Sequence, residues 1–309
     1  MFEAPNPTAL NPTALNPTAL KPTALNPTAA NPTALNPTAL NPAAPDPAAL
    51  VELAEVGVSF DAKVTWALQN VNLQVDPGER WVVLGPNGSG KSTMVQLVSG
   101  YLHPSVGALS LFGGQLGKGV DWRRLRLGVG VMSASFAKMV RPELTGQDVV
   151  MTAKNGALEP WWHEYDDDDR TRAYELLNAG GFGYLASREF GVCSEGERQQ
   201  IQLARVLMAN PKLLVLDEPA AGLDLGARER LVARMAAVAA DPTVPGLMLV
   251  THHVEEIAPG FTHALVLRKG EVVAQGPFDE TLTGKTVSHA FDVNVTIDRN
   301  AGRLNCRFV

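Results

Sequence analysis

The chain has 309 residues, of which 45% are hydrophobic and 19% are charged, and its formal net charge is −6. This length supports one large or two small hydrophobic cores, and the acidic balance excludes the chain-wide basic surface that broad nucleic-acid binding requires. The two cysteines indicate no disulfide framework and fit a reducing cytosol. No apolar run reaches the ~18 residues of a membrane span, and the N-terminus lacks the features of a secretory signal.

The N-terminal segment is a repeat. Residues 6–50 consist of the pentapeptide Asn-Pro-Thr-Ala-Leu with small variations, and proline recurs at every fifth position from Pro7 to Pro47. Proline at this period removes helical hydrogen bonds and excludes central strands, and the repeat has few large apolar residues for a core. We therefore predict a disordered or turn-rich tail over residues 1–50. It is either a tandem repeat without a role, which we favour, or a spacer that binds a partner.

Predicted strands then lead to a glycine-rich loop. Apolar patterning predicts strands at residues 51–60 and 68–75. A turn at residues 76–79 connects them to a short apolar strand at residues 81–84. A glycine-rich stretch and an apolar helix at residues 94–98 follow, which is the context that a phosphate-binding loop needs.

The glycine-rich loop has a sequence pattern that binds phosphate. Gly85, Gly90, Lys91 and Ser92 satisfy the spacing G-x-x-x-x-G-K-[ST]. Glycines let backbone N–H groups turn toward phosphate oxygens, and the helix adds the positive end of its dipole. We expect Lys91 to reach the β- and γ-phosphates and the Ser92 hydroxyl to ligate Mg²⁺. The predicted phosphate site comprises Gly85, Pro86, Asn87, Gly88, Ser89, Gly90, Lys91, Ser92 and Thr93.

The middle of the chain changes from strands to helices. Short strands are predicted at residues 107–112 and 129–132. From about residue 136 to residue 192 the pattern favours an inserted, mostly helical subdomain, with helices at residues 145–154 and 167–177.

An acidic cluster begins the second of these helices. Residues 166–169 are four adjacent aspartates, and His163 and Glu164 precede them. A metal cluster is one interpretation, but four neighbouring carboxylates on one helix start cannot all converge on one ion. Acidic residues also suit the positive end of a helix, so we favour a helix cap.

A second acidic pair follows a strand that we expect to be buried on both faces. Residues 213–216 are an unbroken apolar run, followed by Asp217 and Glu218. Ligands bind at the carboxyl ends of strands in parallel α/β sheets. We expect Asp217 to hold the Mg²⁺ that Ser92 shares, and Glu218 to position or deprotonate an attacking water.

The C-terminal third adds one more candidate side chain. A helix at residues 225–239 precedes another buried strand at residues 246–251. His252 and His253 follow directly after this strand. One of these histidines is expected to hydrogen-bond a γ-phosphate oxygen, although a histidine after a strand is more often structural.

Two predicted hairpins complete the chain. Residues 264–268 and 271–274 form the first, and residues 290–309 form two strands around a turn at 298–302.

Taken in this order, the segments resemble the nucleotide-binding subunits of ATP-binding cassette (ABC) transporters over about residues 51–283. Residues 85–93 match the Walker A loop, and residues 213–218 match Walker B with its catalytic glutamate. Residues 193–197, with the helix at residues 198–208, look like the signature motif and its helix.

Three smaller features extend the resemblance. Residues 221–224 look like the D-loop, and Thr251 with His252 looks like the switch histidine. Phe60 is placed like the aromatic residue that stacks on adenine, and Trp66 is a rival for that role.

The sequence departs from the family pattern in two places. The third signature residue is Glu195, where the family has a small residue, while Ser194 and Gly196 are kept. The glutamine of the Q-loop is missing, and Ser133 or Ser135 is expected to contact Mg²⁺ through water in its place. A branch resembling the molybdate-type cassette proteins also carries serine at this position.

The resemblance implies an α/β fold, a P-loop NTPase (RecA-like) core with an antiparallel β subdomain and the inserted α-helical subdomain. The ABC ATPase domain would span residues 51–285, and residues 286–309 would form a short C-terminal β extension. Two copies would form a head-to-tail dimer that binds ATP and Mg²⁺ and works with integral-membrane permease subunits, on the cytoplasmic, inner face of the cell membrane, without nucleic acid. The implied catalytic residues are Glu218 and His252, and the implied nucleotide contacts across the dimer are Ser194, Gly196, Glu197 and Asp224.

Two other functions remain open at this point. One is a soluble cassette ATPase without a membrane partner that acts on ribosomes or DNA, although the acidity argues against broad nucleic-acid binding. The other is a regulatory ATP binder that hardly hydrolyses ATP, which the missing glutamine favours and Glu218 opposes. We favour the transporter ATPase, whose substrate would be a molybdate-like oxyanion or a metal chelate.

Overall fold

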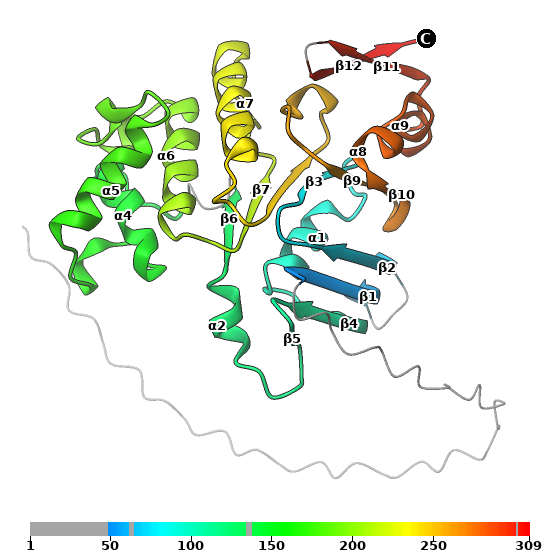
Figure 1. Ribbon diagram of the computed structural model, residues 1–309, viewed down its shortest axis with the longest axis horizontal. Helices are drawn as coiled ribbons and strands as arrows, with labels where there is room; N and C mark the ends of the chain where they lie inside the picture. Colours follow the sequence, from blue (N-terminus) through cyan, green and yellow to red (C-terminus); the bar gives the residue numbers. More distant parts are fainter. Residues whose placement is uncertain (1–48, 62–64, 134–137, 301) are drawn as a thin grey trace, which may run out of the picture. The chain divides into compact units, whose positions relative to one another are not determined.

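The computed structural model describes residues 49–61, 65–133, 138–300 and 302–309. Apart from residues 49 and 50, the repeat tail lies outside these ranges and stays a prediction. The described residues form sheets of six, four and two strands with helices between them (Figure 1). No helix in these ranges is long and apolar enough to cross a membrane.

The largest sheet contains the strands that position the predicted phosphate loop: β3 (Arg80–Leu84), β6 (Val129–Ser133), β7 (Leu213–Asp217), β8 (Leu247–Thr251), β9 (His263–Arg268) and β10 (Glu271–Pro277). Their order is β10-β9-β3-β8-β7-β6, and all neighbours are parallel except β10 and β9. Strands β3 and β8 are buried along their whole length, as is typical of parallel strands covered on both faces. Along β3, Val82 faces the core that includes α7 (Leu225–Ala240), and Val83 faces the core that includes α1 (Lys91–Val98).

A second sheet is antiparallel and consists of β1 (Val51–Ser59), β2 (Trp66–Val75), β4 (Val106–Leu111) and β5 (Gly114–Gln115). Its order is β2-β1-β4-β5, and its apolar face packs on α1 and on one face of the six-stranded sheet. Leu50 is buried and its N–H donates to the carbonyl oxygen of Val75, so packing begins just before β1. The predicted antiparallel β subdomain is confirmed.

The inserted subdomain contains the short helices α4 (Gly146–Met151), η1 (Thr152–Asn155), η2 (Pro160–Trp162), α5 (Asp167–Asn178), η3 (Gly183–Leu185) and η4 (Phe190–Val192). Most of them surround a core of their own, and α2 (Trp122–Arg126) precedes them in the chain. Helix α6 (Glu195–Met208) joins this subdomain to the central sheet, because Ile201 faces the subdomain core and Leu203 faces the core of the sheet. Helix α6 begins three residues before the predicted start at residue 198, since Ser194 caps it.

The acidic cluster at residues 166–169 is a helix cap, as favoured from the sequence. The Asp166 side chain accepts the Asp169 N–H at 2.8 Å, and the Asp169 side chain accepts the Asp166 N–H at 3.2 Å. Lys154 donates to Asp169 at 2.6 Å, and this hydrogen bond lowers the pKa of the Asp169 carboxyl. The carboxylates of Asp166 and Asp169 are therefore committed to the helix start and to Lys154.

The C-terminal region contains two helices that the sequence did not suggest. After η5 (Val254–Glu256) come α8 (Phe278–Thr281) and α9 (Gly284–Phe291), followed by β11 (Val295–Asn300) and β12 (Arg303–Phe308). Two terminal strands do form, but residues 290 and 291 belong to α9 and residues 298–300, which were predicted as part of the turn, belong to β11. Both helices are too short to show helical periodicity, and the Thr283 side chain caps α9 by accepting the Thr286 N–H.

Candidate active site

The loop between β3 and α1 is shaped by two glycines. Gly90 has a φ of +104°, and a Cβ at this position would lie 2.6 Å from the carbonyl oxygen of Ala67. A Cβ at Gly85 would lie 2.5 Å from the carbonyl oxygen of Leu267. Neither position has room for a side chain, so the loop backbone lies close to β2 and β9.

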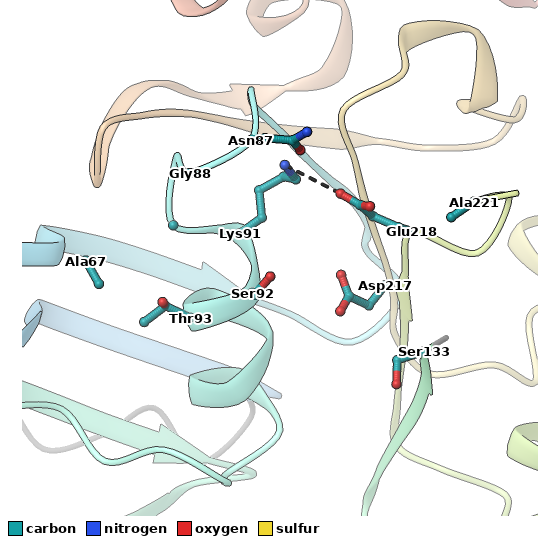
Figure 2. A pocket seen from close by; sticks show the side chains of 11 residues that line it. Ala67, Asn87, Gly88, Lys91, Ser92, Thr93, Ser133, Asp217, Glu218 and Ala221 are labelled. Atoms are coloured by element: carbon teal, nitrogen blue, oxygen red, sulfur yellow. Dashed lines mark ion pairs between the residues drawn. The ribbon is translucent and has the colours of Figure 1, made fainter. Parts of the chain in front are cut away.

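A cavity of about 490 Å³, which we call the first cavity, opens beside this loop (Figure 2). It brings together side chains from the loop, from the ends of β6 and β7, and from the start of β2. Its lining is Ala67, Asn87, Gly88, Gly90, Lys91, Ser92, Thr93, Ser133, Asp217, Glu218 and Ala221. The predicted phosphate loop and the predicted acidic pair therefore share one cavity.

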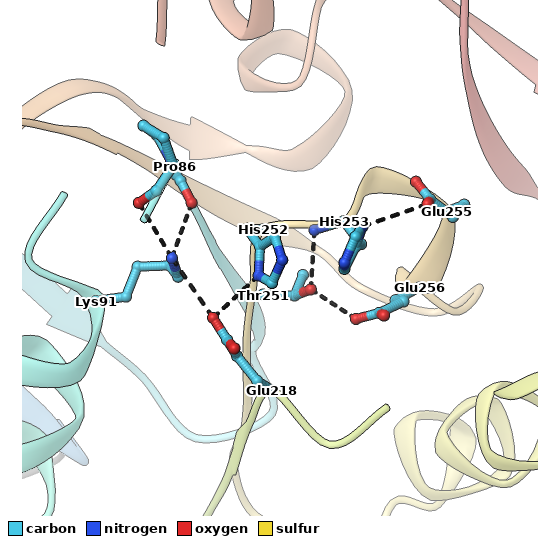
Figure 3. Close-up of polar contacts among 9 residues, drawn as sticks. Pro86, Lys91, Glu218, Thr251, His252, His253, Glu255 and Glu256 are labelled. Atoms are coloured by element: carbon cyan, nitrogen blue, oxygen red, sulfur yellow. Dashed lines mark hydrogen bonds and ion pairs between the residues drawn. The ribbon is translucent and has the colours of Figure 1, made fainter. Parts of the chain in front are cut away.

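Lys91 lies at the centre of this arrangement. Its Nζ donates to the carbonyl oxygens of Gly85 at 3.0 Å and Pro86 at 3.1 Å, and lies 3.6 Å from Glu218 Oε1 (Figure 3). The Lys91 side chain is only 6% exposed, so its ammonium acts in a medium of reduced polarity. Ser89 belongs to the loop, and its buried hydroxyl makes no hydrogen bond within the described residues.

Glu218 is held in an unusual backbone conformation at the end of β7. Its φ is +46°, a region that non-glycine residues rarely adopt, and its N–H donates to the carbonyl oxygen of Val250 at 2.8 Å. This conformation turns the carboxylate toward the loop, where Oε1 lies 3.0 Å from His252 Nδ1. Glu218 Oε1 is thus shared between Lys91 and His252 (Figure 3).

Asp217 carries an electrostatic cost in this cavity. Burial raises the pKa of the Asp217 carboxyl to about 6, the neighbouring Glu218 carboxylate adds to the increase, and the Lys91 ammonium opposes it. The two adjacent carboxylates, Asp217 and Glu218, have one nearby cation, Lys91, so the site attracts a further positive charge. Hard oxygen ligands from Asp217 and the Ser92 hydroxyl line the same cavity, and this donor set suits Mg²⁺.

A separate second cavity of about 460 Å³ lies where α6 and α7 begin. It is lined by Phe182, Tyr184, Ser194, Glu195, Gly196, Glu197, Gln200, Gly222, Leu223, Asp224, Ala227 and Arg230. Four predicted nucleotide contacts (Ser194, Gly196, Glu197 and Asp224) meet here, and this lining shares no residue with that of the first cavity. Within one chain the predicted phosphate and Mg²⁺ residues therefore lie apart from these four contacts, while Phe60 and His252 line neither cavity.

Two of these predicted contacts form the cap of α6. Ser194 Oγ accepts the Glu197 N–H at 3.3 Å, and Glu197 Oε2 accepts the Ser194 N–H at 2.7 Å. Glu197 Oε1 accepts from the Tyr184 hydroxyl at 3.2 Å and from Arg188 at 3.1 Å. Both carboxylate oxygens of Glu197 are thus engaged within the chain, and hydrogen bonds from Ser194 and Tyr184 lower its pKa although burial opposes this.

The other residues of the second cavity set its shape and charge. Asp224 caps α7 by accepting the Ala227 N–H at 2.7 Å. A Cβ at Gly196 would lie 2.9 Å from the Cβ of Ala227, so glycine allows α6 and α7 to approach closely. The Glu195 carboxylate accepts from the Gln199 amide at 3.3 Å, which directs it along α6.

Comparison with known proteins identifies the family. The profile of the family described as ABC transporter matches residues 68–221. YlmA of Bacillus subtilis, an ABC transporter ATP-binding protein, is 32% identical over 254 residues, which cover 82% of this chain and 95% of YlmA. The chain belongs to the ABC transporter ATP-binding family. The hemin import ATP-binding protein HmuV of Gloeobacter violaceus is 31% identical to this ABC ATPase, covering 84% of this chain and 93% of HmuV.

Solved structures agree with this assignment. The structure of cbiO1 from Clostridium perfringens, part of the ABC transporter complex cbiONQ, has a TM-score of 0.66 and 25% identity, covering 78% of this chain and 93% of cbiO1. The ATP-binding cassette MJ0796, bound to ADP and Pi after hydrolysis, has a TM-score of 0.62 and 24% identity, covering 74% and 98%. The predicted fold class is confirmed, and the chain is the ATP-binding and ATP-hydrolysing subunit of an ABC transporter.

Neither candidate for the adenine-stacking aromatic residue lines the first cavity of this ABC ATPase. Phe60 is 69% exposed at the end of β1. Trp66 is half-buried at the start of β2, where its ring packs against Gly57, although its neighbour Ala67 does line the cavity. The adenine-stacking role of Phe60, with Trp66 as its rival, therefore stays a prediction.

Two serines, Ser133 and Ser135, were expected to replace the missing glutamine, and the structure describes Ser133. Ser133 ends β6, pairs in register with Asp217 on β7 and lines the first cavity. Ser135 lies outside the described residues. Ser133 is therefore placed where a contact with a bound cation through water is feasible.

Sequence reasoning missed Arg230, which lines the second cavity from α7. Its guanidinium makes no ion pair with any described residue, and it lies near Gly226 at the start of the helix. The sequence offers little signal for this residue, because Arg228 and Arg234 occur on the same helix at similar spacing.

Proposed function

We propose that two copies of this ABC ATPase associate head to tail and enclose two ATP molecules. Each ATP would lie between the first cavity of one copy and the second cavity of the other. The observation that carries this proposal is the division of the family's nucleotide-binding motifs between two cavities that share no residue. The related cassette MJ0796 has been solved as a dimer, which supports this arrangement.

We propose specific roles for the residues of the first cavity and for His252, which contacts Glu218. The phosphate loop and Lys91 bind the ATP phosphates, and Glu218 accepts a proton from the attacking water. His252 holds the γ-phosphate and keeps Glu218 in place through its contact of 3.0 Å. Ser92 and Asp217 would hold Mg²⁺, which neutralises phosphate charge when bound.

The second cavity would complete the neighbour's site. Ser194 and Gly196 present the N-terminus of α6, which favours an anion. Glu195 brings a negative charge close to this helix end, and Arg230 faces the same cavity without an ion-pair partner among the described residues. Arg198 already lies 3.9 Å from the Glu195 carboxylate, and we assign to Arg230 the second positive charge that offsets Glu195 when the neighbour's γ-phosphate approaches.

ATP binding would close the dimer and hydrolysis would open it, because the γ-phosphate contacts both copies. This cycle would act on integral-membrane permease subunits at the inner face of the cell membrane. YlmA is named as an ABC transporter ATP-binding protein and HmuV as a hemin import ATP-binding protein, which favours this function over a soluble cassette ATPase.

The transported substrate is proposed only as a class. HmuV is a hemin import protein, and hemin is a metal chelate. PhnC of Alcaligenes faecalis, 30% identical, is a phosphonates import protein, and phosphonates are oxyanions. Each of the two predicted substrate classes, metal chelates and oxyanions, is thus represented by one relative. Neither HmuV nor PhnC supports the molybdate-type branch, which stays a prediction.

The variant Glu218→Gln tests the proposed function. It should bind ATP with the parent's affinity, fail to hydrolyse it and run as a dimer in gel filtration with ATP and Mg²⁺. Purified from detergent-solubilised membranes of its host with ATP present, it should bring a multi-span membrane protein in stoichiometric amount. Hydrolysis at the parent rate would refute the role of Glu218, and a soluble dimer without a membrane partner would refute the transport role.

A further inference from the structure

The C-terminal hairpin β11–β12 has no part in the proposed function, yet it is packed firmly against the ATPase. Leu304 on β12 and Val295 on β11 are 2% and 7% exposed and belong to the same core as α7 and β8. Arg303 begins β12 beside them and is half-buried. The hairpin therefore reaches the region where α7 and the segment after His252 lie together.

Arg303 joins these two elements. Its Nη1 donates to Glu229 Oε2 at 2.8 Å and its Nη2 donates to Glu229 Oε1 at 3.2 Å, a bidentate pair. The same Nη2 donates to the carbonyl oxygen of Glu255 at 2.7 Å. One planar guanidinium thus fixes a side chain of α7 and a backbone carbonyl of η5 at the same time.

The carbonyl of Glu255 belongs to the turn that carries His252. On the inner side of this turn, the Thr251 hydroxyl donates to the buried Glu256 carboxylate at 2.7 Å and accepts the His253 N–H at 3.0 Å (Figure 3). On the outer side, Arg303 holds the Glu255 carbonyl. The turn is therefore held by hydrogen bonds of Thr251 within it and by the hydrogen bond from Arg303 of the hairpin.

The position of this turn sets the contact between His252 and Glu218. His252 follows directly after β8, and its Nδ1 lies 3.0 Å from Glu218 Oε1. A displacement of η5 would move the backbone around His252, and hydrogen bonds weaken steeply with distance and angle. Helix α7 is a suitable anchor, because its 16 residues are packed into the main core and capped by Asp224.

We propose that Arg303 is a positioning residue for ATP hydrolysis, which anchors the turn carrying His252 to α7 and so keeps His252 against Glu218. Arg303 itself lines neither cavity. The proposal rests on the proposed roles of His252 and Glu218, and it assigns the terminal hairpin a part in the reaction rather than in ATP binding.

The variant Arg303→Ala tests this assignment on the full chain. We expect kcat to fall about tenfold, since a small misplacement of a catalytic group has effects of this size, while the KM and the dissociation constant for ATP stay within about twofold of the parent. Arg307→Ala is the matched control, because Arg307 lies on the same strand and its ion pair, among the residues that the structure describes, is with Asp298 of the same hairpin. Equal kcat values for Arg303→Ala and Arg307→Ala would overturn the proposal.

Two conservative variants separate positioning from loss of stability. Glu229→Gln keeps an acceptor for Arg303 and leaves the Glu255 carbonyl contact possible, so its kcat should fall less than that of Arg303→Ala. Arg303→Lys keeps one donor near both partners and should recover part of the kcat, even if Arg303→Ala folds poorly. A kcat of Arg303→Lys as low as that of Arg303→Ala, in a protein that melts like the parent, would contradict the proposal.

A double-mutant cycle with His252→Ala distinguishes this inference from the proposed function. If Arg303 acts through His252, Arg303→Ala should cause little further loss of kcat in the His252→Ala background. A full tenfold loss in that background would overturn the inference and leave the role of His252 intact. A parental kcat for His252→Ala alone would instead refute the role of His252 in the proposed function.

Discussion

Lys91 Nζ lies 3.6 Å from Glu218 Oε1, and the same oxygen lies 3.0 Å from His252 Nδ1. The phosphate-loop lysine and the candidate base are thus in one polar chain, which crosses from α1 through β7 to β8. The Lys91 ammonium attracts the Glu218 carboxylate, and a carboxylate held in this place can accept a proton from water. The contact also offsets part of the repulsion between Glu218 and Asp217.

Replacing Lys91 with alanine should remove ATP binding. Lys91 supplies a buried ammonium to phosphate oxygens, and charge-assisted contacts of this kind are among the strongest single interactions in a site. We expect the dissociation constant of a fluorescent ATP analogue to rise by at least about two orders of magnitude for Lys91→Ala. Lys118→Ala is the control, because Lys118 is exposed and outside the first cavity. Unchanged binding in Lys91→Ala would refute the phosphate-loop assignment.

The first cavity could be predicted largely from the sequence because its parts follow local rules. The spacing of Gly85, Gly90, Lys91 and Ser92 encodes a loop and a helix start. The acidic pair at Asp217 and Glu218 follows a buried strand, and carboxyl ends of parallel strands meet at one edge of a sheet. These two facts are sufficient to bring the loop and the pair together, as the lining of the first cavity does.

The second cavity and the C-terminal region were predicted less well, for physical reasons. Arg230 and Arg303 owe their places to tertiary packing, and the sequence shows only arginines among other charged residues. Helix α9 has eight residues and gains its stability from the sheet beneath it, so propensity alone is a weak guide. The cap formed by Ser194 and Glu197 was not predicted, although serine followed three residues later by glutamate is the pattern of a capping box.

Removing the charge of Asp217 should stabilise the nucleotide-free protein at neutral pH. The pKa of Asp217 is about 6 in the folded protein and about 4 in an unfolded chain. Between these values the folded state binds more protons than the unfolded state, so this group makes stability fall as pH rises from about 4 to about 6. Asp217→Asn should therefore raise the free energy of unfolding at pH 7.5 by about 1–3 kcal/mol.

Urea denaturation at two pH values checks this prediction in the absence of nucleotide and Mg²⁺. The gain from Asp217→Asn should be present at pH 7.5 and largely absent near pH 4, while ATP hydrolysis is lost at every pH. Asp168→Asn is the control, because Asp168 is exposed on α5 and is expected to change stability by less than about 0.5 kcal/mol. A gain independent of pH would indicate that burial of the Asp217 charge is not its cause.

Glu197 should tolerate glutamine but not alanine. Its carboxylate accepts the Ser194 N–H and closes the cap of α6, and a glutamine amide oxygen can accept the same bond. We expect Glu197→Gln to stay within about 0.5 kcal/mol of the parent in free energy of unfolding and Glu197→Ala to lose about 1 kcal/mol. Urea denaturation measures both. A Glu197→Gln variant as unstable as Glu197→Ala would show that the contacts with Arg188 and Tyr184, rather than the cap, determine its contribution.

Reversing the charge of Arg230 should weaken dimerisation without affecting ATP binding to one copy. Arg230 lines the second cavity, is exposed and has no ion-pair partner among the described residues, so Arg230→Glu should leave the fold intact. In the Glu218→Gln background, a second carboxylate beside Glu195 would face the neighbour's γ-phosphate, and like charges at close range are unfavourable. We expect the dimer dissociation constant with ATP and Mg²⁺ to rise about tenfold or more in analytical ultracentrifugation. Arg172→Glu on α5 changes the net charge equally and should dimerise like its parent, so equal weakening in both variants would reduce the effect to overall charge and refute the assignment of Arg230.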